Sequence, residues 1–596
     1  MRLINVKAFI ERERLIRVGN PVDHHTKVLE FVNDERIKYA ILSHRWVRQE
    51  VDYDEMVELA KMDRKERDEI RQRDGYRKIL QCCEQAQKDG YEWLWVDTCC
   101  IDKRSSAELS EAINSMYRWY ENAKVCYAYL HDVPGPWFPT TRDHERYPNF
   151  NGWPEWFSRG WTLQELIAPS NVQFLNKNWQ SIGNKKTLAL TLVGITGIPE
   201  HVLTHGLHEN RPCVAQIMSW AAHRKTTRVE DRAYSLMGLL NVFVSMSYGE
   251  EKNVFRRLQL EIIHGSNDQS IFAWDWDRKN EQPGSILAGD PSDFRRCGEM
   301  ELMGHDEFIE YIKEDIPEEE LDSVEDRLGV FPITNRGIHI WLFLRRHRDS
   351  PSLFLAQLPC RSGRWCRPAT IPLVLWGSNS YYRCPTQSFG LFALGGPLQL
   401  RQIYLRYQDP PHRNTTFEID DSALTKNGLT CCGVYPRKFT GNTLTVTNTG
   451  PLCIKVYSDD RSNHRFVVGF GQSFGKDWIH VVSDEPNTSL RLPWEDYAIR
   501  EYPKMLVRTL TEHAQAQHMN KACSGPERYG QICIMQTRLP QTTARIIQIS
   551  SVMWKNSRMR GVKLDVFRDP GVGNVFSKWT VFDVNVGSFC FTSHWH

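Results

Sequence analysis

Between residues 37 and 175, short apolar runs alternate with segments of helical periodicity. The runs are residues 37–43 (IKYAILS), 92–97 (EWLWVD), 124–130 (KVCYAYL) and 171–175 (NVQFL). Each has the length of a buried strand. Residues 76–88 and 107–122, which lie between runs, repeat apolar side chains every three or four positions, as helices with one buried face do. Strands separated by such helices predict βαβ units and a parallel sheet, the architecture of an α/β domain.

The rest of the chain is predicted to fold differently. Because 596 residues exceed one ordinary hydrophobic core, we expect a multidomain protein. Residues 1–180 form the α/β domain in this prediction, and residues 181–280 form a helical extension. Residues 285–596 carry strand-like runs separated by Pro, Gly, Asn and Asp, which predicts an all-β region of sandwich or barrel type, in one unit or two. The charged residues 52–74 are predicted to form a solvated helix.

Charge and composition argue against several classes of protein. A net charge of +2 provides no basic field for nucleic acid. No apolar stretch is long enough to span a membrane, and the first residues are charged, without the apolar core of a signal peptide. The 16 cysteines follow no disulfide framework, which indicates reduced thiols in a cytosolic or nuclear compartment. We expect the protein to be cytoplasmic.

A tryptophan and a glutamate stand four residues apart in residues 157–166 (FSRGWTLQEL). Trp161 and Glu165 therefore fall on one face of a helical turn, in apolar surroundings that favour burial. A buried carboxylate is either tied to a structural partner or kept for chemistry. The structural alternative is that Glu165 caps the turn or pairs with Arg159 while Trp161 fills the core.

Polar and aromatic residues follow the ends of the first two strands. The first strand ends at Ser43 and is followed by Arg45 and Trp46. The second strand ends at Asp97. Ligands of open α/β sheets bind at this edge. Arg45 is suited to a phosphate and Trp46 to stacking on a base, although a buried tryptophan beside a surface arginine is an equally good interpretation. Asp97 is the next acidic candidate, whereas Asp102 is predicted to cap a turn.

Other possible catalytic and metal-binding motifs are not supported by the residues around them. Residues 471–475 (GQSFG) match a nucleophile-elbow pattern but lie between two strand-like runs, so we predict a hairpin turn. The chain has no P-loop, and it lacks the Cys-x-x-Cys and His-Glu-x-x-His patterns of metal sites, so no metal site is predicted. Cys99 or Cys100 with His44 is a conceivable nucleophile pair, but packing is the favoured interpretation for cysteines beside a buried strand.

The first half of the chain resembles the fungal heterokaryon incompatibility (HET) domain. The blocks that carry the resemblance are Tyr39–Trp46, Trp95–Lys103, Ser105–Tyr117, Val125–Leu130 and Arg159–Leu166, followed downstream by Thr226–Gly238. The family usually has a glycine after the tryptophan of the first block, where this chain has Val47. That departure is expected to alter the loop after the first strand.

The resemblance implies self/non-self recognition in a filamentous fungus, with a domain that triggers programmed cell death as part of allorecognition and fungal innate immunity. It also implies a fold similar to Toll/interleukin-receptor (TIR) domains. Plant TIR domains carry a W-C-x-x-E-L motif whose glutamate acts in NAD cleavage, and Trp161–Leu166 is similar to it. By this analogy Glu165 is the catalytic residue and Trp161 a wall of the pocket. NAD is then a substrate, and no cofactor is implied.

Two functions follow as hypotheses. In the first, the chain is an effector of incompatibility-linked cell death that consumes NAD or a related nucleotide through a glycohydrolase-like reaction. In the second, the HET domain is a non-enzymatic signalling module that forms homo-oligomers or recruits partners. The sequence names neither the protein partner nor the allelic determinant. The β-rich half is assigned a sensor or regulatory role by elimination. The two hypotheses differ over whether Glu165 faces an open pocket or is used by a structural pair.

Overall fold

The computed structural model describes most of the chain. The described residues are 1–275 apart from 21, 23–26, 34–36 and 209, then 284–316, 327–329, 331–347, 353–363, 367–376, 379–384, 394–408, 415–436, 442–446, 452–459, 465–473, 476–483, 492–511, 532–538, 545–553, 559–568 and 580–582. The chain divides into two compact units. The first unit comprises Met1–Asp275, Leu287–Phe308 and Leu358–Ala369, and the second comprises Trp276–Ile286, Ile309–Gln357 and Thr370–His596.

A seven-stranded sheet organises the first unit, in the order β2-β1-β4-β3-β5-β6-β7. Its strands are β1 (Arg2–Asn5), β2 (Leu29–Phe31), β3 (Tyr39–His44), β4 (Trp93–Trp95), β5 (Val125–Tyr129), β6 (Val172–Leu175) and β7 (Ser181–Asn184). The four central strands are parallel, which confirms the predicted sheet. The sequence analysis missed the antiparallel strands β1, β2 and β7, which complete the two edges.

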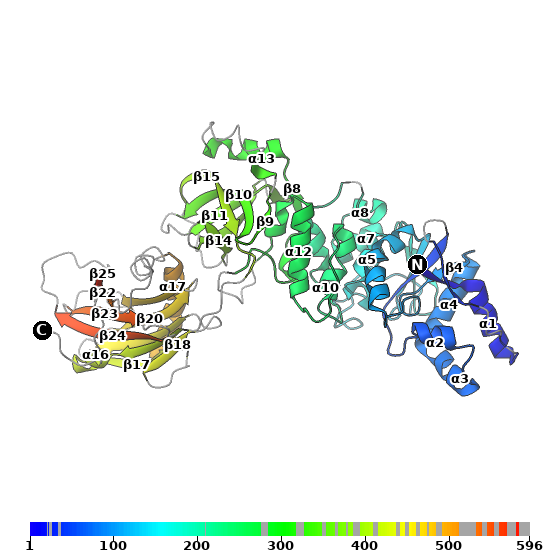
Figure 1. The fold of residues 1–596 in the computed structure, drawn as a ribbon, viewed down its shortest axis with the longest axis horizontal. Helices are drawn as coiled ribbons and strands as arrows, with labels where there is room; N and C mark the ends of the chain where they lie inside the picture. Colours follow the sequence, from blue (N-terminus) through cyan, green and yellow to red (C-terminus); the bar gives the residue numbers. More distant parts are fainter. Residues whose placement is uncertain are drawn as a thin grey trace. The chain divides into compact units, whose positions relative to one another are not determined.

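Helices cover this sheet on both faces. They are α1 (Val6–Val18), α2 (Tyr53–Glu58), α3 (Arg64–Gln72), α4 (Asp74–Lys88) and α5 (Ser106–Asn122). Helix α1 lies beside α4 (Figure 1). The ring centroids of Phe9 on α1 and Tyr76 on α4 are 5.7 Å apart. Helix α5 packs on the strands through Trp119, whose carbonyl accepts a hydrogen bond from the Tyr39 hydroxyl. The single helix predicted for residues 52–74 is wrong, because Asp63 caps a new helix N-terminus within it.

Short helices lie between and after the last strands of the sheet along the chain. They are α6 (Thr162–Ile167), α7 (Ala189–Thr196), α8 (Glu200–His205), α9 (Val214–Ala221), α10 (Asp231–Tyr234), α11 (Met237–Leu240), α12 (Asn253–Gly265) and α13 (His305–Ile312). The first unit also holds a pair of antiparallel strands, β8 (Met300–Leu302) and β12 (Cys360–Ser362). Among the described residues, no helix is long and apolar enough to cross a membrane.

The second unit is rich in strands, as predicted, and includes a closed barrel. The barrel strands are β10 (Gly337–His347), β11 (Leu353–Leu358), β13 (Ala369–Leu375), β14 (Ser380–Arg383) and β15 (Leu394–Leu405), with β9 (Ile333–Thr334) paired outside β10. Closure follows because β11 pairs with both β13 and β10. This confirms the barrel form of the predicted β-rich region.

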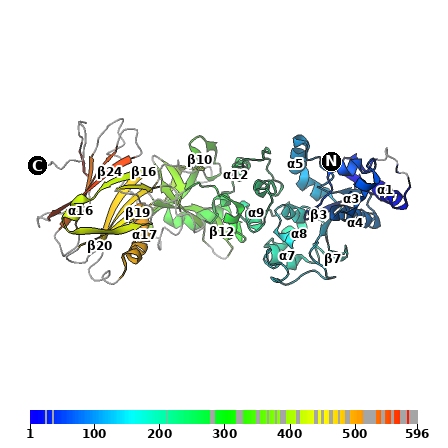
Figure 2. The ribbon, with the colours of Figure 1, turned by 90° about the horizontal axis from the view of Figure 1, so that it is seen from below.

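Two further sheets of this unit pack face to face. The six-stranded sheet contains β16 (Thr415–Asp420), β18 (Thr443–Val446), β22 (Ile532–Arg538), β23 (Arg545–Met553), β24 (Met559–Arg568) and β25 (Thr580–Phe582). The four-stranded sheet contains β17 (Leu429–Tyr435), β19 (Leu452–Asp459), β20 (Arg465–Ser473) and β21 (Lys476–Ser483). Phe417, Phe470 and Val562 meet in the core between them. Figure 2 shows α17 (Trp494–Thr511) beside the four-stranded layer, and α16 (Ser422–Lys426) precedes β17.

The predicted hairpin at residues 471–475 is borne out by its strands. Strands β20 and β21 pair antiparallel as far as Ser473 and Lys476. Phe474 and Gly475 lie outside the described residues. A serine on the ladder of a hairpin has none of the strand-to-helix geometry that exposes a catalytic nucleophile.

Gly238 on α11 lies where the helical extension closely approaches α5. A Cβ atom on Gly238 would lie 2.2 Å from Cβ of Tyr117. We therefore predict that Gly238→Ala lowers the free energy of unfolding by about 1–3 kcal/mol, because the helices must separate. Gly194→Ala on α7 is the matched control, since a Cβ there meets nothing within 4 Å, and a gain of up to about 1 kcal/mol is expected. Urea denaturation of both variants measures the difference, and equal effects would contradict the close approach.

Candidate functional site

Glu165 of α6 meets the carboxyl end of β3. Its carboxylate accepts a short hydrogen bond from the hydroxyl of Ser43, the last residue but one of that strand. The indole N–H of Trp156, in the 3-10 turn that precedes α6, donates to the same hydroxyl oxygen at 2.8 Å. Ser43 is fully buried and Glu165 is 7% exposed. The structure thus joins two of the predicted site residues, on different elements, by a direct hydrogen bond.

Burial changes the acidity of Glu165. Removal from water raises the pKa of this carboxyl to about 8, although the hydrogen bond from Ser43 opposes the rise. The nearby charge of Asp97 acts in the same direction as burial. Arg159, the partner considered from the sequence, acts on Glu165 through its charge, which lowers the pKa. The carboxyl is therefore mostly protonated at pH 7 and ionises just above it.

A buried arginine holds the N-terminal turn of α6. Arg224 donates hydrogen bonds of 2.9 Å to the carbonyl of Arg159 and to the hydroxyl of Thr162. Burial lowers the pKa of Arg224 to about 9, and the charge of Glu165 acts against that shift. Arg232 in turn donates to the Arg224 carbonyl and forms a bidentate ion pair with Asp290. The block Thr226–Gly238 thus braces the helix that carries Glu165.

A buried lysine holds the other end of the same helix. The ammonium group of Lys185 donates to the carbonyls of Leu166 and Ile167, at 3.1 and 3.3 Å, and to that of Pro169. Burial lowers the pKa of Lys185 to about 8. These carbonyls are orphaned at the helix C-terminus, and a cation there also complements the helix dipole. The six residues of α6 are therefore fixed at both ends, and Glu165 between them has little freedom to move.

Trp161 is used differently from Glu165. Its side chain hydrogen-bonds to the carboxylate of Asp231, which also accepts from the hydroxyl of Tyr248 at 3.1 Å. Burial raises the pKa of Asp231. The two residues share α6, but Glu165 turns to the strand end while the indole of Trp161 contacts the downstream helical block.

His44 lies at the same strand end but on the opposite face of β3, because adjacent strand residues alternate in direction. Its Nε2 lies 3.7 Å from Oδ1 of Asp97 and 3.9 Å from Oε1 of Glu50, and Glu50 forms an ion pair of 2.5 Å with Lys78. Burial and the charge of Lys78 lower the pKa of His44 well below its usual value, so the ring is neutral. Sequence reasoning considered His44 only as a partner for cysteine.

Several buried polar atoms at this edge have no hydrogen bond. Within the described part of the chain, both ring nitrogens of His44, Oδ1 of Asp97 and Oε2 of Glu50 make none. Buried polar atoms in native proteins are normally satisfied by protein, water or a bound group. Oδ1 of Asp97 and the His44 ring face each other beyond hydrogen-bond distance. The carboxyl edge of β3 and β4 therefore carries polar groups that the protein itself does not satisfy.

Arg45 and Trp46 occupy the rim of this edge. Arg45 forms an ion pair with Glu155, at 2.6 Å between Nε and Oε1. Trp46 donates from Nε1 to Oδ2 of Asp97 at 2.7 Å, and the ammonium of Lys103 lies 3.9 Å from its ring. Trp46 is 47% exposed, so part of its ring remains open to solvent. The structure brings Trp46 and Asp97 together, as predicted for one sheet edge, and gives Arg45 an acidic partner.

The other candidate residues from the sequence, the cysteines and Asp102, have contacts that suit packing or turn formation. A hydrogen bond with Cys100 and burial raise the pKa of the Cys99 thiol well above its usual value, which disfavours a nucleophilic thiolate. Asp102 accepts from the backbone N–H of Arg104 at 3.1 Å and so caps a turn, as predicted. The twelve cysteines whose side chains the structure describes are free thiols. Over the same residues, no three His, Cys, Asp or Glu side chains are grouped so as to hold a metal ion.

Comparison with known proteins identifies the class of domain. Residues 39–151 match the family model described as heterokaryon incompatibility protein (HET). Over 220 residues the chain is 44% identical to the vegetative incompatibility protein HET-E-1 of Podospora anserina. That match covers 36% of this chain and 15% of the relative, so the chain spans only a small part of that protein's length. The chain therefore carries a HET domain, which confirms the resemblance found from the sequence blocks.

The family match has a boundary that bears on the site. It includes β3, β4, α5 and β5, and it ends before the block Arg159–Leu166. Among solved structures, a lectin of Xerocomus chrysenteron and a mutated form of it are 9% identical to this chain. Each match covers 26% of this chain and 100% or 99% of the lectin, with a TM-score of 0.17, which is too low to support any argument on fold or ligand.

The raised pKa of Glu165 predicts a pH-dependent effect of Glu165→Gln on stability. The wild-type fold is stabilised by the proton on Glu165, and this contribution is complete below the ordinary carboxyl pKa and lost as pH rises through about 8. The free energy of unfolding of the variant relative to wild type should therefore increase with pH, by at most about 1.4 kcal/mol per pH unit.

Urea denaturation from about pH 5 to about pH 9 measures this difference. Glu200→Gln, at an exposed position of α8, serves as the control and should show no such slope. A difference that stays constant with pH for Glu165→Gln would show that this carboxyl titrates normally.

Proposed function

We propose that this chain is a cytoplasmic effector of vegetative incompatibility that triggers regulated cell death in a filamentous fungus, through a TIR-like HET domain that cleaves NAD or a related nucleotide. The HET domain and the 44% identity to a vegetative incompatibility protein support the biological part. One observation carries the chemical part: a protonatable, buried Glu165 is bonded to Ser43 at the carboxyl edge of the parallel sheet. Acidic side chains with a shifted pKa at that edge of the sheet are characteristic of ligand sites in α/β folds.

The chemistry requires an anion near the ribose. Cleavage breaks the bond between ribose C1′ and the nicotinamide nitrogen, and the electron pair of that bond leaves with neutral nicotinamide. The ribose becomes oxocarbenium-like, water adds to C1′, and one proton is released. Ionised Glu165 stabilises the cationic ribose and accepts hydrogen bonds from its hydroxyls. The positive charge of the nicotinamide ring favours the ionised form, so bound substrate lowers the pKa of Glu165.

The surrounding residues divide the remaining tasks. Ser43 orients the carboxylate, and the open part of the Trp46 ring stacks on a base of the substrate. The unsatisfied oxygen of Asp97 and the neutral ring of His44 supply hydrogen-bonding groups beside it. Because Trp156 and α6 bury Ser43 and Glu165, the state described here is the resting state in this proposal, and substrate binds after the turn around Trp156 opens.

A second function is favoured by exposed aromatic side chains in the first unit. Trp137 is 82% exposed and Phe31 is 74% exposed. Such side chains are available for contact with a partner chain or a second copy of this chain. In this alternative the HET domain self-associates or recruits an allelic partner without enzymatic activity. The hydrogen bond between Ser43 and Glu165 then serves only to join α6 to the sheet.

The proposal predicts release of nicotinamide that depends on Glu165. Full-length protein at high concentration should release nicotinamide from NAD, and Glu165→Ala and Glu165→Gln should each lower kcat by roughly 100-fold or more. Glu200→Gln should leave the rate unchanged. Liquid chromatography of nicotinamide gives the rate, and light scattering of the same samples gives the oligomeric state. Activity that survives both Glu165 substitutions removes the mechanism. A wild type that self-associates but releases no nicotinamide favours the second function.

The pH profile should follow the same carboxyl. Because the ionised form acts, kcat/KM of the free protein should rise about tenfold per pH unit below an apparent pKa near 8 and level off above it. If kcat/KM instead falls with pH over this range, the protonated form of Glu165, or another group, acts in the reaction.

A further inference from the structure

One end of the barrel in the second unit is lined by cations. Along β10 the inward-facing residues Ile338, Ile340, Leu342 and Leu344 are buried, and the next residue in that alternation is Arg346. The residues of β15 that pair with β10 also change from apolar to polar toward the same end of the barrel. Ile340 pairs with Ile403, whereas Leu342 pairs with Arg401 and Leu344 with Gln399. The apolar interior of the barrel therefore gives way to arginine and glutamine at its mouth.

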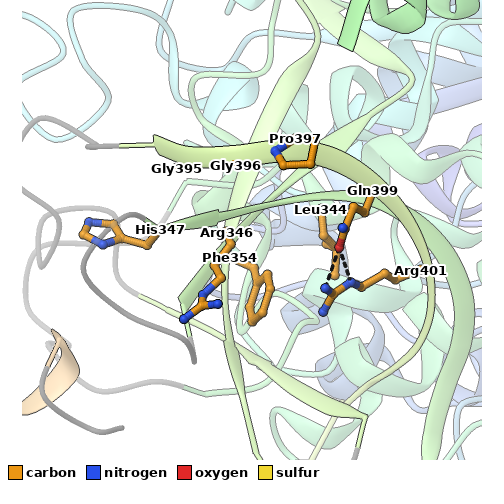
Figure 3. A pocket seen from close by; sticks show the side chains of 9 residues that line it. All are labelled: Leu344, Arg346, His347, Phe354, Gly395, Gly396, Pro397, Gln399 and Arg401. Atoms are coloured by element: carbon orange, nitrogen blue, oxygen red, sulfur yellow. Dashed lines mark hydrogen bonds between the residues drawn. The ribbon is translucent and has the colours of Figure 1, made fainter. Parts of the chain in front are cut away.

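These side chains border a cavity of about 400 Å³ (Figure 3). Arg346 and Arg401 lie on either side of Phe354, the first inward residue of β11, while His347 points away from them. The lining includes basic side chains and no carboxylate among the described residues. Barrel mouths are frequent ligand sites because the strands hold the lining side chains in fixed positions.

Uncharged groups hold Arg401 in place. Its Nε and Nη2 donate to Oε1 of Gln399 at 3.1 and 2.5 Å, and its guanidinium carbon lies 5.3 Å from the centre of the Phe354 ring. It also hydrogen-bonds to the hydroxyl of Tyr381, whose ring contacts Phe354 edge-on at 5.6 Å. Among the described residues, no carboxylate compensates its charge. A fixed guanidinium with neutral partners is suited to bidentate recognition of an anion.

A bulge between β10 and β15 places glycines at the mouth. Gly395 and Gly396 border the cavity, and a Cβ on Gly396 would meet nothing within 4 Å. Gly396 has a φ of 82°, which L side chains rarely adopt. The register of β10 and β15 shifts at this point, between Arg345 and His347. This bulge places two residues without side chains at the entrance.

We propose that the barrel mouth binds a small phosphate monoester. The fixed guanidinium of Arg401 is suited to bidentate contact with a phosphate group, and Arg346 lines the same cavity. The cavity is far larger than a phosphate group, so it also accommodates the organic part of the ester. The proposal is independent of NAD cleavage, because the site lies in the second unit and contains none of the residues of the HET domain. It gives the second unit a ligand of its own.

Binding assays with the full-length chain test this site. Calorimetry is carried out with a nucleoside monophosphate, a hexose monophosphate, inorganic phosphate, and the matching uncharged nucleoside and hexose. At least one ester should bind more tightly than inorganic phosphate, and the uncharged compounds should not bind. Arg401→Gln should weaken ester binding at least tenfold, as expected for the loss of one bidentate contact. Arg346→Gln, at an exposed position that is safe for folding, should also weaken it.

The matched control is Arg336→Gln, which makes the same change of charge before the opposite end of β10. It should bind the ester as wild type does. Glu165→Ala should bind normally too, so failure of this site and failure of NAD cleavage are distinguishable. Absence of ester binding by wild type, or equal binding by wild type, Arg401→Gln and Arg346→Gln, would overturn the proposal.

Discussion

The hydrogen bond between Ser43 and Glu165 is the contact on which the rest of the first unit depends. It joins the end of the central strand β3 to a helix of six residues that is too short to be stable alone. Buried cations fix that helix at both ends, Arg224 at its start and Lys185 at its end. Burying each charge costs free energy, and the hydrogen bonds to backbone and hydroxyl oxygens offset part of that cost. The result is a carboxyl held in a dry position at the sheet edge with its pKa raised.

The sequence predicted the central sheet well because the signal is local. Each parallel strand is a continuous apolar run, and the helix between two runs shows its own period. The edge strands β1, β2 and β7 have three or four residues each, too few for a period to appear. The partner of Glu165 was not predictable, because Ser43 lies 122 residues away and Trp156 covers both only in the folded chain. Arg224 and Lys185 carried no signal in the sequence, since a lone basic residue is usually exposed.

The second unit shows the same limit in another form. Its strand-like runs predicted a β-rich region, but a closed barrel depends on the pairing of β11 with β10 and β13, which no local pattern encodes. Arg346 and Arg401 would each be interpreted from the sequence as surface residues of a strand. Register places them at one mouth, where apolar neighbours and Gln399 fix the second of them. Both candidate sites of this chain thus arise where a regular element ends and an inward-facing position becomes polar.

The central claim is that Glu165 is a protonated, buried acid poised to ionise near neutral pH. Titration of its side-chain carboxyl carbon by ¹³C NMR, with Glu165→Gln used to assign the resonance, measures this directly. The account predicts a midpoint near 8, set by burial against the hydrogen bond from Ser43. A midpoint at or below the ordinary carboxyl value of about 4.3 would contradict it, because the carboxylate would then be an ordinary ionised group in contact with water.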